Sequence, residues 1–168
     1  MRDEARLSGR CSCGAVAYRL DAEPLVVHAC HCTWCQRESG SAFALNGMIE
    51  SRHIAVTKGA PLARELPSAS GKGQRVMACP SCGVALWASY HGTGPRFAYV
   101  KMGTLDDTSG VRPDVHIFTS TKQPWLVLTG AVPVFEGFYR RSEVWRPDAY
   151  ARFQAERTRE GRDGSPLA

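Results

Sequence analysis

Seven cysteines stand in three clusters whose spacing is typical of metal ligands. Three lie within six residues, in the segment CHCTWC at 30–35. The other four form two close pairs, CSC at 11–13 and CPSC at 79–82. In a reducing compartment such clusters indicate metal binding or redox chemistry, not a disulfide framework, and an odd number of cysteines fits full pairing badly.

We interpret the outer pairs, Cys11, Cys13, Cys79 and Cys82, as a structural zinc site. Zinc binds four thiolates tetrahedrally at about 2.3 Å, so their sulfurs lie about 3.8 Å apart. A CxxC turn brings two sulfurs together, whereas a CxC strand must bend, and Gly14 and Gly83 supply the backbone freedom. Two alternatives are a thioredoxin-like redox pair, which requires a βαβ context, and two unconnected buried pairs.

The inner cysteines, Cys30, Cys32 and Cys35, provide three ligands for a second zinc. A histidine in the fourth position would close the site, whereas water or substrate there would make it catalytic, and the spacing fits both. The candidate closing ligands are His28, His31, His53, His91 and His116. Three thiolates on Zn²⁺ give a net charge of −1, which favours capture of a soft thiolate over generation of hydroxide.

Residues near the inner cysteines are candidates for proton transfer and substrate binding. His116 is our candidate acid or base, because its ordinary pKa suits proton transfer near neutrality, and His31 is a second candidate. The alternative for both is a hydrogen-bonded core histidine. The candidates for binding a substrate carboxylate or walling the site are Arg37, Ser39, Gly40, Ser41 and Trp125. Their alternatives are a polar loop without a ligand and, for Trp125, a core position.

The elements that must position these residues are short strands. Residue patterns predict strands in the ranges 14–18, 25–28, 42–45, 52–57, 61–67, 74–78, 84–88, 96–102 and 115–118. Residues 36–41 look like a polar loop. One helix is predicted over 148–159, with Pro147 in its first turn, followed by fraying from Gly161 to Ala168. The sequence therefore predicts a mainly β domain over 1–145 and a C-terminal helix and tail over 146–168.

Composition is typical of a soluble protein, with 168 residues, 43% apolar and 22% charged residues, and a net charge of +5. No run approaches the roughly 20 apolar residues of a membrane helix, and the first ten residues do not look like a signal peptide, so we expect a cytoplasmic protein. Arginine is frequent in the last thirty residues, but acidic residues are interspersed among the arginines. This pattern favours a solvated face over nucleic-acid binding.

Several segments resemble the glutathione-dependent formaldehyde-activating enzyme family, which shares its domain with centromere protein V. They are GRCSCGAV at 9–16, CHCTWCQRESGSAF at 30–43 and CPSCG at 79–83. The segment DVHIF at 114–118, with Lys122, Pro124 and Trp125, resembles the C-terminal signature of the family. The resemblance implies an Mss4-like zinc-stabilised β fold, structural zinc on the outer four cysteines and catalytic zinc on the inner three.

The resemblance also implies an activity, the joining of formaldehyde and glutathione, formally that of a carbon–sulfur lyase. We therefore expect a zinc-dependent lyase acting on a thiol–aldehyde adduct, with a small-molecule thiol such as glutathione as partner and no redox cofactor. A homo-oligomer is compatible with the sequence. The alternative is a non-catalytic zinc module that binds glutathione, a protein or nucleic acid. Retention of all three inner cysteines favours the enzyme, because a scaffold needs only the outer zinc.

Overall fold

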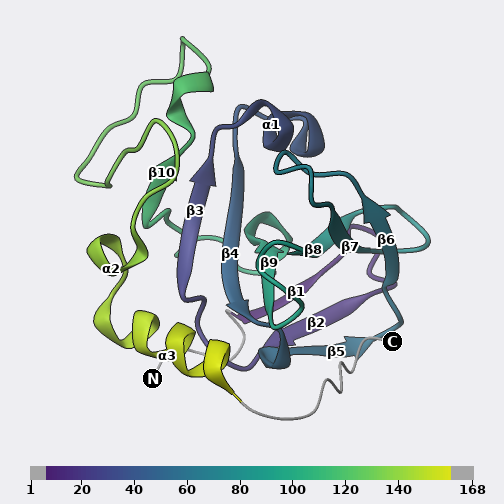
Figure 1. The fold of residues 1–168 in the computed structure, drawn as a ribbon. Helices are drawn as coiled ribbons and strands as arrows, with labels where there is room; N and C mark the ends of the chain where they lie inside the picture. The colour runs from purple at the N-terminus through teal and green to yellow at the C-terminus, as the bar shows by residue number, and fades with distance from the viewer. Residues whose placement is uncertain (1–6, 160–168) are drawn as a thin grey trace.

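The computed structural model describes residues 7–159, which form two β-sheets with short helices around them (Figure 1). The smaller sheet contains β1 (Ser8–Arg10), β2 (Ala17–Leu20) and β5 (Ile54–Lys58). The larger sheet contains, in spatial order, β10 (Val115–Ile117), β3 (Val26–Cys30), β4 (Ala44–Glu50), β9 (Phe97–Lys101), β8 (Ala85–Tyr90), β7 (Gln74–Ala78) and β6 (Leu62–Leu66). The expected mainly β fold, with short helices that include one near the C-terminus, is confirmed.

Strand β10 differs from its neighbours because it pairs parallel with β3, whereas the other pairs of the larger sheet are antiparallel. Val115, His116 and Ile117 stand opposite His28, Ala29 and Cys30. A parallel connection requires a long crossover. Here the whole chain from β4 to β9 lies between the two strands, so the segment carrying His116 reaches the three-cysteine segment from far along the sequence.

Three α-helices and three short 3₁₀ helices complete the described chain. They are α1 (Thr33–Ser39), η2 (Ser51–His53), η3 (Met102–Thr104), η4 (Thr119–Thr121), α2 (Arg141–Val144) and α3 (Pro147–Thr158). Helix α1 replaces the polar loop expected over residues 36–41. It begins because the Cys32 sulfur caps it, accepting a hydrogen bond from the Cys35 N–H at 3.3 Å, and it ends at Gly40 in the left-handed conformation.

Helix α3 is the predicted C-terminal helix, with Pro147 in its first turn as expected. It packs Phe153 on Phe97 at 5.0 Å between ring centres, and Arg152 ion-pairs with Glu50 at 2.6 Å. The arginine-rich helix was expected to be solvated, but it contacts the sheet through this ion pair. The division at residue 145 stays a prediction, and the predicted tail from Gly161 to Ala168 lies outside the described residues. No helix within 7–159 is long and apolar enough to span a membrane.

The larger sheet has two chemically different faces because side chains alternate along each strand. One face packs on the smaller sheet and holds the main core, including Tyr18, Leu20, Ile49, Trp87 and Val100. We call the other the cysteine face, since the register places Cys30 there. The same register adds the polar or aromatic residues His28, Asn46, Gln74, Tyr90, Tyr99 and Lys101 to that face.

Candidate metal and substrate site

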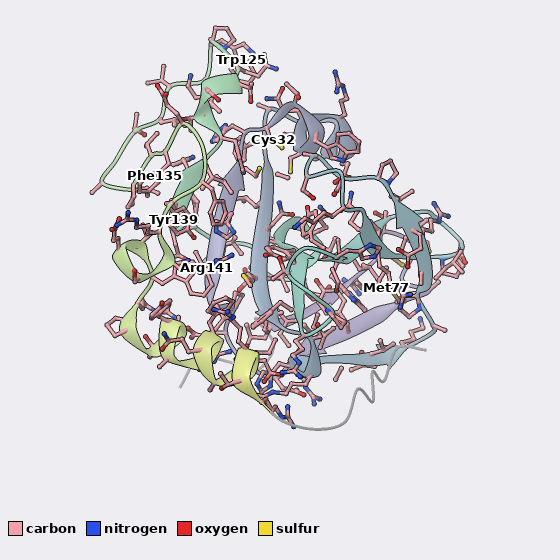
Figure 2. The ribbon with its side chains drawn as sticks, viewed as in Figure 1. Cys32, Met77, Trp125, Phe135, Tyr139 and Arg141 are labelled. Carbon is pink, nitrogen blue, oxygen red and sulfur yellow. The ribbon has the colours of Figure 1, made fainter. Side chains whose placement is uncertain are left out.

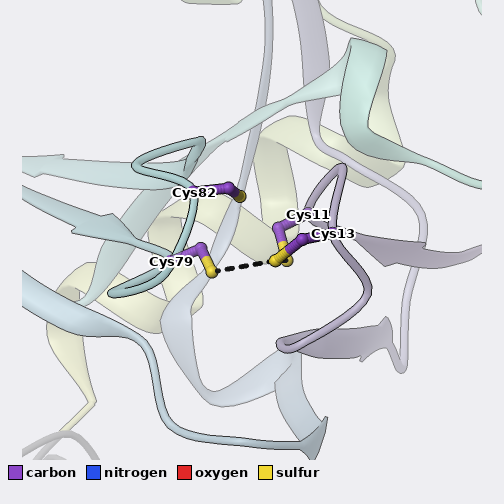
Figure 3. A group of neighbouring side chains, drawn as sticks. All are labelled: Cys11, Cys13, Cys79 and Cys82. Atoms are coloured by element: carbon purple, nitrogen blue, oxygen red, sulfur yellow. Dashed lines mark hydrogen bonds between the residues drawn. The ribbon is translucent and has the colours of Figure 1, made fainter.

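Cys11, Cys13, Cys79 and Cys82 come together as the four-cysteine site (Figure 3). Their four sulfur atoms lie within 4.8 Å of one another, with Cys11 and Cys13 at 3.5 Å and Cys13 and Cys79 at 3.7 Å. These separations match the roughly 3.8 Å between sulfurs on one tetrahedral zinc. The four thiols thus fit the metal-binding set expected from the sequence.

Two similar turns shape the four-cysteine site. The N–H of Gly14 donates to the Cys11 carbonyl at 3.0 Å, and the N–H of Gly83 donates to the Cys79 carbonyl at 2.9 Å. Both glycines have positive φ, +69° and +75°, a conformation that side chains with a Cβ rarely adopt. The Val16 N–H donates to the Cys11 sulfur at 3.3 Å. This bond, with weaker contributions from the neighbouring thiols, lowers the pKa of the Cys11 thiol to about 6, which favours the thiolate that a metal requires.

The three-cysteine site consists of Cys30 at the end of β3, Cys32 capping α1 and Cys35 inside α1. Their sulfur atoms lie within 4.8 Å of one another. Hydrogen bonding among the thiols divides them: the Cys30 and Cys35 thiols lower the pKa of Cys32, and the pKa values of Cys30 and Cys35 are raised. Within residues 7–159 these two cysteine groups are the ones arranged for a metal ion, and no histidine joins the inner three.

The backbone beside the three-cysteine site is held by side chains from two segments. Gln36 donates to the carbonyls of His31 at 2.7 Å and Thr121 at 2.9 Å, and the Thr121 hydroxyl donates to the His31 carbonyl at 3.0 Å. Gln123 donates to the Gln36 side-chain oxygen at 2.7 Å. The loop that carries the cysteines is therefore fixed to the segment that follows β10.

A second set of contacts holds α1 against the sheet through Glu38. The Glu38 carboxylate accepts hydrogen bonds from Trp34 at 2.8 Å and from the side chain of Gln74, and its other oxygen lies 3.9 Å from the Lys101 nitrogen. Lys101 also donates to Asn46 at 3.1 Å. Helix α1, which carries Cys35, thus has polar links through Glu38 to β7 and β9.

His31 and His116 form a buried hydrogen-bonded pair, with His31 Nε2 and His116 Nδ1 2.9 Å apart. Burial lowers the pKa of both imidazoles, that of His31 to about 4. Nδ1 of His31 is buried without a hydrogen-bond partner. Since His116 stands opposite Ala29, and His31 follows Cys30, both rings lie on the opposite side of the sheet from the Cys30 side chain.

The remaining candidates lie on exposed surface. Arg37, Ser39 and Gly40 are in or just after α1, and Ser41 follows them, all exposed. The Ser39 hydroxyl donates to the Cys35 carbonyl at 2.7 Å, so it is used within its own helix. Trp125 is 70% exposed on the loop that projects beyond β10 (Figure 2). It is therefore not a core residue, the alternative weighed for it above.

Sequence reasoning missed the cysteine-face residues that surround the site. Asn46, Gln74, Tyr90, Tyr99 and Lys101 belong to four different strands, and only the sheet order brings them together. Tyr90 and Tyr99 pack edge to face with ring centres 4.9 Å apart. Burial raises the pKa of Tyr90, so its hydroxyl stays protonated and can donate a hydrogen bond.

With this geometry established, comparison with known proteins defines the class. The chain belongs to the glutathione-dependent formaldehyde-activating enzyme family, whose model matches residues 6–121. A crystal structure of a Rhodobacter sphaeroides protein is similar to 63% of this chain and 91% of its own, at 21% identity and a TM-score of 0.44. No curated protein sequence matches the chain significantly. The family resemblance drawn from the cysteine segments is confirmed.

Proposed function

We propose that the protein is a zinc-dependent carbon–sulfur lyase acting on a thiol–aldehyde adduct of the S-hydroxymethylglutathione type. The observation that carries this proposal is the three-cysteine site, with three convergent sulfurs and no fourth protein ligand in the described chain. Zinc held there would supply an open position for a soft thiolate, whereas the four-cysteine site offers a closed shell. Family membership supports a formaldehyde- and glutathione-related substrate.

The proposed reaction breaks one carbon–sulfur bond and transfers a proton from oxygen to sulfur. In the lyase direction the carbon–sulfur bond of the adduct breaks, the hydroxyl oxygen loses its proton and becomes the aldehyde carbonyl, and the sulfur leaves as a thiolate that a proton then neutralises. The chain must therefore hold the sulfur and accept a proton from oxygen. Cys30, Cys32 and Cys35 serve the first task as the ligand set.

For the proton we keep His116 and His31 as the proposed acid–base pair. Their mutual hydrogen bond and the unpartnered Nδ1 of His31 support a role in proton handling. The alternative is a structural role, since both rings lie on the opposite side of the sheet from the Cys30 side chain. A His116→Asn variant separates the two: an acid–base role removes one limb of the pH–rate profile, whereas a structural role lowers stability and leaves the shape of that profile unchanged.

The alternative, a non-catalytic zinc module that binds a protein partner, has one observation in its favour. No charged residue stands between Lys122 and Glu136, and within this stretch Trp125 and Val127 are 70% and 76% exposed. A projecting uncharged apolar loop is typical of interaction surfaces. Under this alternative the three-cysteine site would bind zinc but show no turnover of any thiol–aldehyde adduct.

The test of the enzyme proposal is the zinc content of freshly purified, reduced protein, compared with that of Cys32→Ser and Cys79→Ser. We expect two zinc ions per wild-type chain, one in a folded Cys32→Ser, and unfolding in Cys79→Ser. Glutathione should change the d–d spectrum of cobalt at the inner site, and S-hydroxymethylglutathione should release formaldehyde. The lyase proposal is wrong if wild type and Cys32→Ser both bind one zinc ion per chain. It is also wrong if the zinc-loaded protein does not turn over S-hydroxymethylglutathione.

A further inference from the structure

The cysteine face holds a cation without an acidic partner, contributed by a part of the chain that the family model does not match. This cation is Arg141, the first residue of α2, twenty residues beyond the end of the match. Figure 2 shows its side chain reaching from α2 toward β3 and β4. Within residues 7–159 no carboxylate lies at ion-pairing distance from it, and its Nε is buried without a hydrogen-bond partner.

Aromatic rings hold the Arg141 guanidinium in place. Its central carbon lies 5.4 Å from the centre of the Phe138 ring, 5.9 Å from that of Trp145 and 5.0 Å from that of Phe153. Stacked rings fix the plane of a guanidinium and leave its edge, which carries the N–H donors, to other groups. An arginine held this way is preorganised for a planar anion.

The surroundings of Arg141 place it on the same face as Cys30. Phe138 and Phe153, two of the rings around Arg141, pack on two residues of the larger sheet, His28 and Phe97, with ring centres 5.9 Å and 5.0 Å apart respectively. Both residues belong to the cysteine face, and His28 precedes Cys30 by two positions, about 7 Å along β3. Arg141 therefore lies over the same face of the sheet that carries Cys30.

A donor edge at this position matches a carboxylate. Guanidinium and carboxylate groups pair through two parallel hydrogen bonds, and a partly buried pair is stronger than an exposed one. The three-cysteine site selects a thiol, so a ligand that satisfies both groups carries a thiol and a carboxylate several bonds apart. A small thiol peptide such as glutathione has this chemistry, whereas a simple alkyl thiol does not.

We propose that Arg141 is the residue that binds a carboxylate of the thiol substrate, and that the C-terminal segment thereby sets the selectivity of the site for anionic thiols. This proposal rests on the proposed function, because it takes the three-cysteine site as the place where the thiol sulfur is held. It assigns α2 a part in recognition in addition to its packing on the sheet.

The test compares a charged and an uncharged probe on the full-length, zinc-loaded chain. Isothermal titration with glutathione and with glutathione diethyl ester is made on wild type, Arg141→Gln and the control Arg140→Gln. Arg140 suits the control because its side chain is 84% exposed and pairs with Glu143 at 3.5 Å on the surface. Arg141→Lys is added because it keeps the positive charge, should Arg141→Gln fold poorly by thermal melting.

We expect Arg141→Gln to weaken glutathione binding at least 10-fold, because a hydrogen bond to a charged group is lost. Binding of the ester should be unchanged. Arg141→Lys should weaken glutathione binding by a smaller factor, again without effect on the ester, and Arg140→Gln should change neither probe by more than about 2-fold. If Arg141→Gln weakens the binding of both probes equally, or weakens the binding of neither probe, the proposed role of Arg141 is wrong. Failure of both probes to bind zinc-loaded wild type would instead overturn the proposed function.

Discussion

His28 Nε2 and the hydroxyl of Tyr139 lie 2.6 Å apart, joining the middle of β3 to the segment that leads into α2. The Trp145 N–H donates to the same hydroxyl at 2.6 Å, and the hydroxyl keeps its own hydrogen free to donate to the unprotonated nitrogen of a neutral His28. Burial and the charge of Arg141 keep this imidazole uncharged, with a pKa of about 4. The attachment of the C-terminal segment therefore depends on the protonation state of one histidine.

This relationship predicts a loss of stability in mild acid. Unfolded His28 binds a proton below about pH 6.5, whereas folded His28 does so only below about pH 4, so stability falls as the pH falls through that window. Between pH 7 and pH 5.5 the expected loss from this group is about 1 kcal/mol. Urea unfolding at both pH values measures this loss in the free energy of unfolding. The loss in His28→Gln should be smaller than that in wild type by the same amount. An identical loss in wild type and variant would contradict the prediction.

Arg152→Ala is expected to destabilise the protein strongly. Glu50 is fully buried, and Arg152 donates to both of its carboxylate oxygens, so removal of the arginine leaves a buried charge without its partner. The expected cost in free energy of unfolding is about 3–5 kcal/mol. Denaturant unfolding measures it, with Arg140→Ala as an exposed control that should stay within about 0.5 kcal/mol of wild type. A similar small change in Arg152→Ala would show that Glu50 does not need its partner.

Glu38→Ala should loosen the three-cysteine site without changing the four-cysteine site. Glu38 links α1, which carries Cys35, to Gln74 and Lys101, and loss of such supporting contacts weakens metal binding by about 10-fold or more. Zinc competition with a chromophoric chelator resolves the two affinities, and the four-cysteine site is the internal control. Glu136→Ala, an exposed substitution, should leave both affinities at their wild-type values. Equal weakening of both sites by Glu38→Ala would indicate general destabilisation instead.

Trp125→Ala tests the predicted substrate role of an exposed residue. Because Trp125 is 70% exposed, its replacement should change the free energy of unfolding by less than about 0.5 kcal/mol. If Trp125 walls the substrate site, glutathione binding by the zinc-loaded chain weakens several-fold. Calorimetry and thermal melting measure the two effects, and unchanged glutathione affinity would remove Trp125 from the substrate-binding residues.

The two cysteine groups that could hold a metal ion were predictable from the sequence because the spacing within each cysteine segment is local. CxC and CxxC turns bring sulfurs together wherever they occur, and Gly14 and Gly83 have the positive φ expected of them. Strand β7 matches its predicted residues 74–78, where Val76, Met77 and Ala78 form a short buried apolar run.

Helix α1 and the cysteine face were not predictable, for two physical reasons. A cysteine sulfur is not among the usual helix-capping groups, so Cys32 gave no signal for the start of α1. The meeting of Glu38, Gln74 and Lys101 depends on strand order and register across the sheet, which a single sequence does not encode locally. Arg141 was predicted only as part of a charged tail, because nothing in the sequence places aromatic rings around it.

The parallel pairing of β10 with β3 has a consequence for the order in which the protein is made. Synthesis proceeds from the N-terminus, and 85 residues separate His31 from His116. The thiols of Cys30, Cys32 and Cys35 therefore leave the ribosome well before the strand that covers one side of their loop. Nascent chains should pass through a stage in which these thiols are open to oxidation, and early metal loading would protect them.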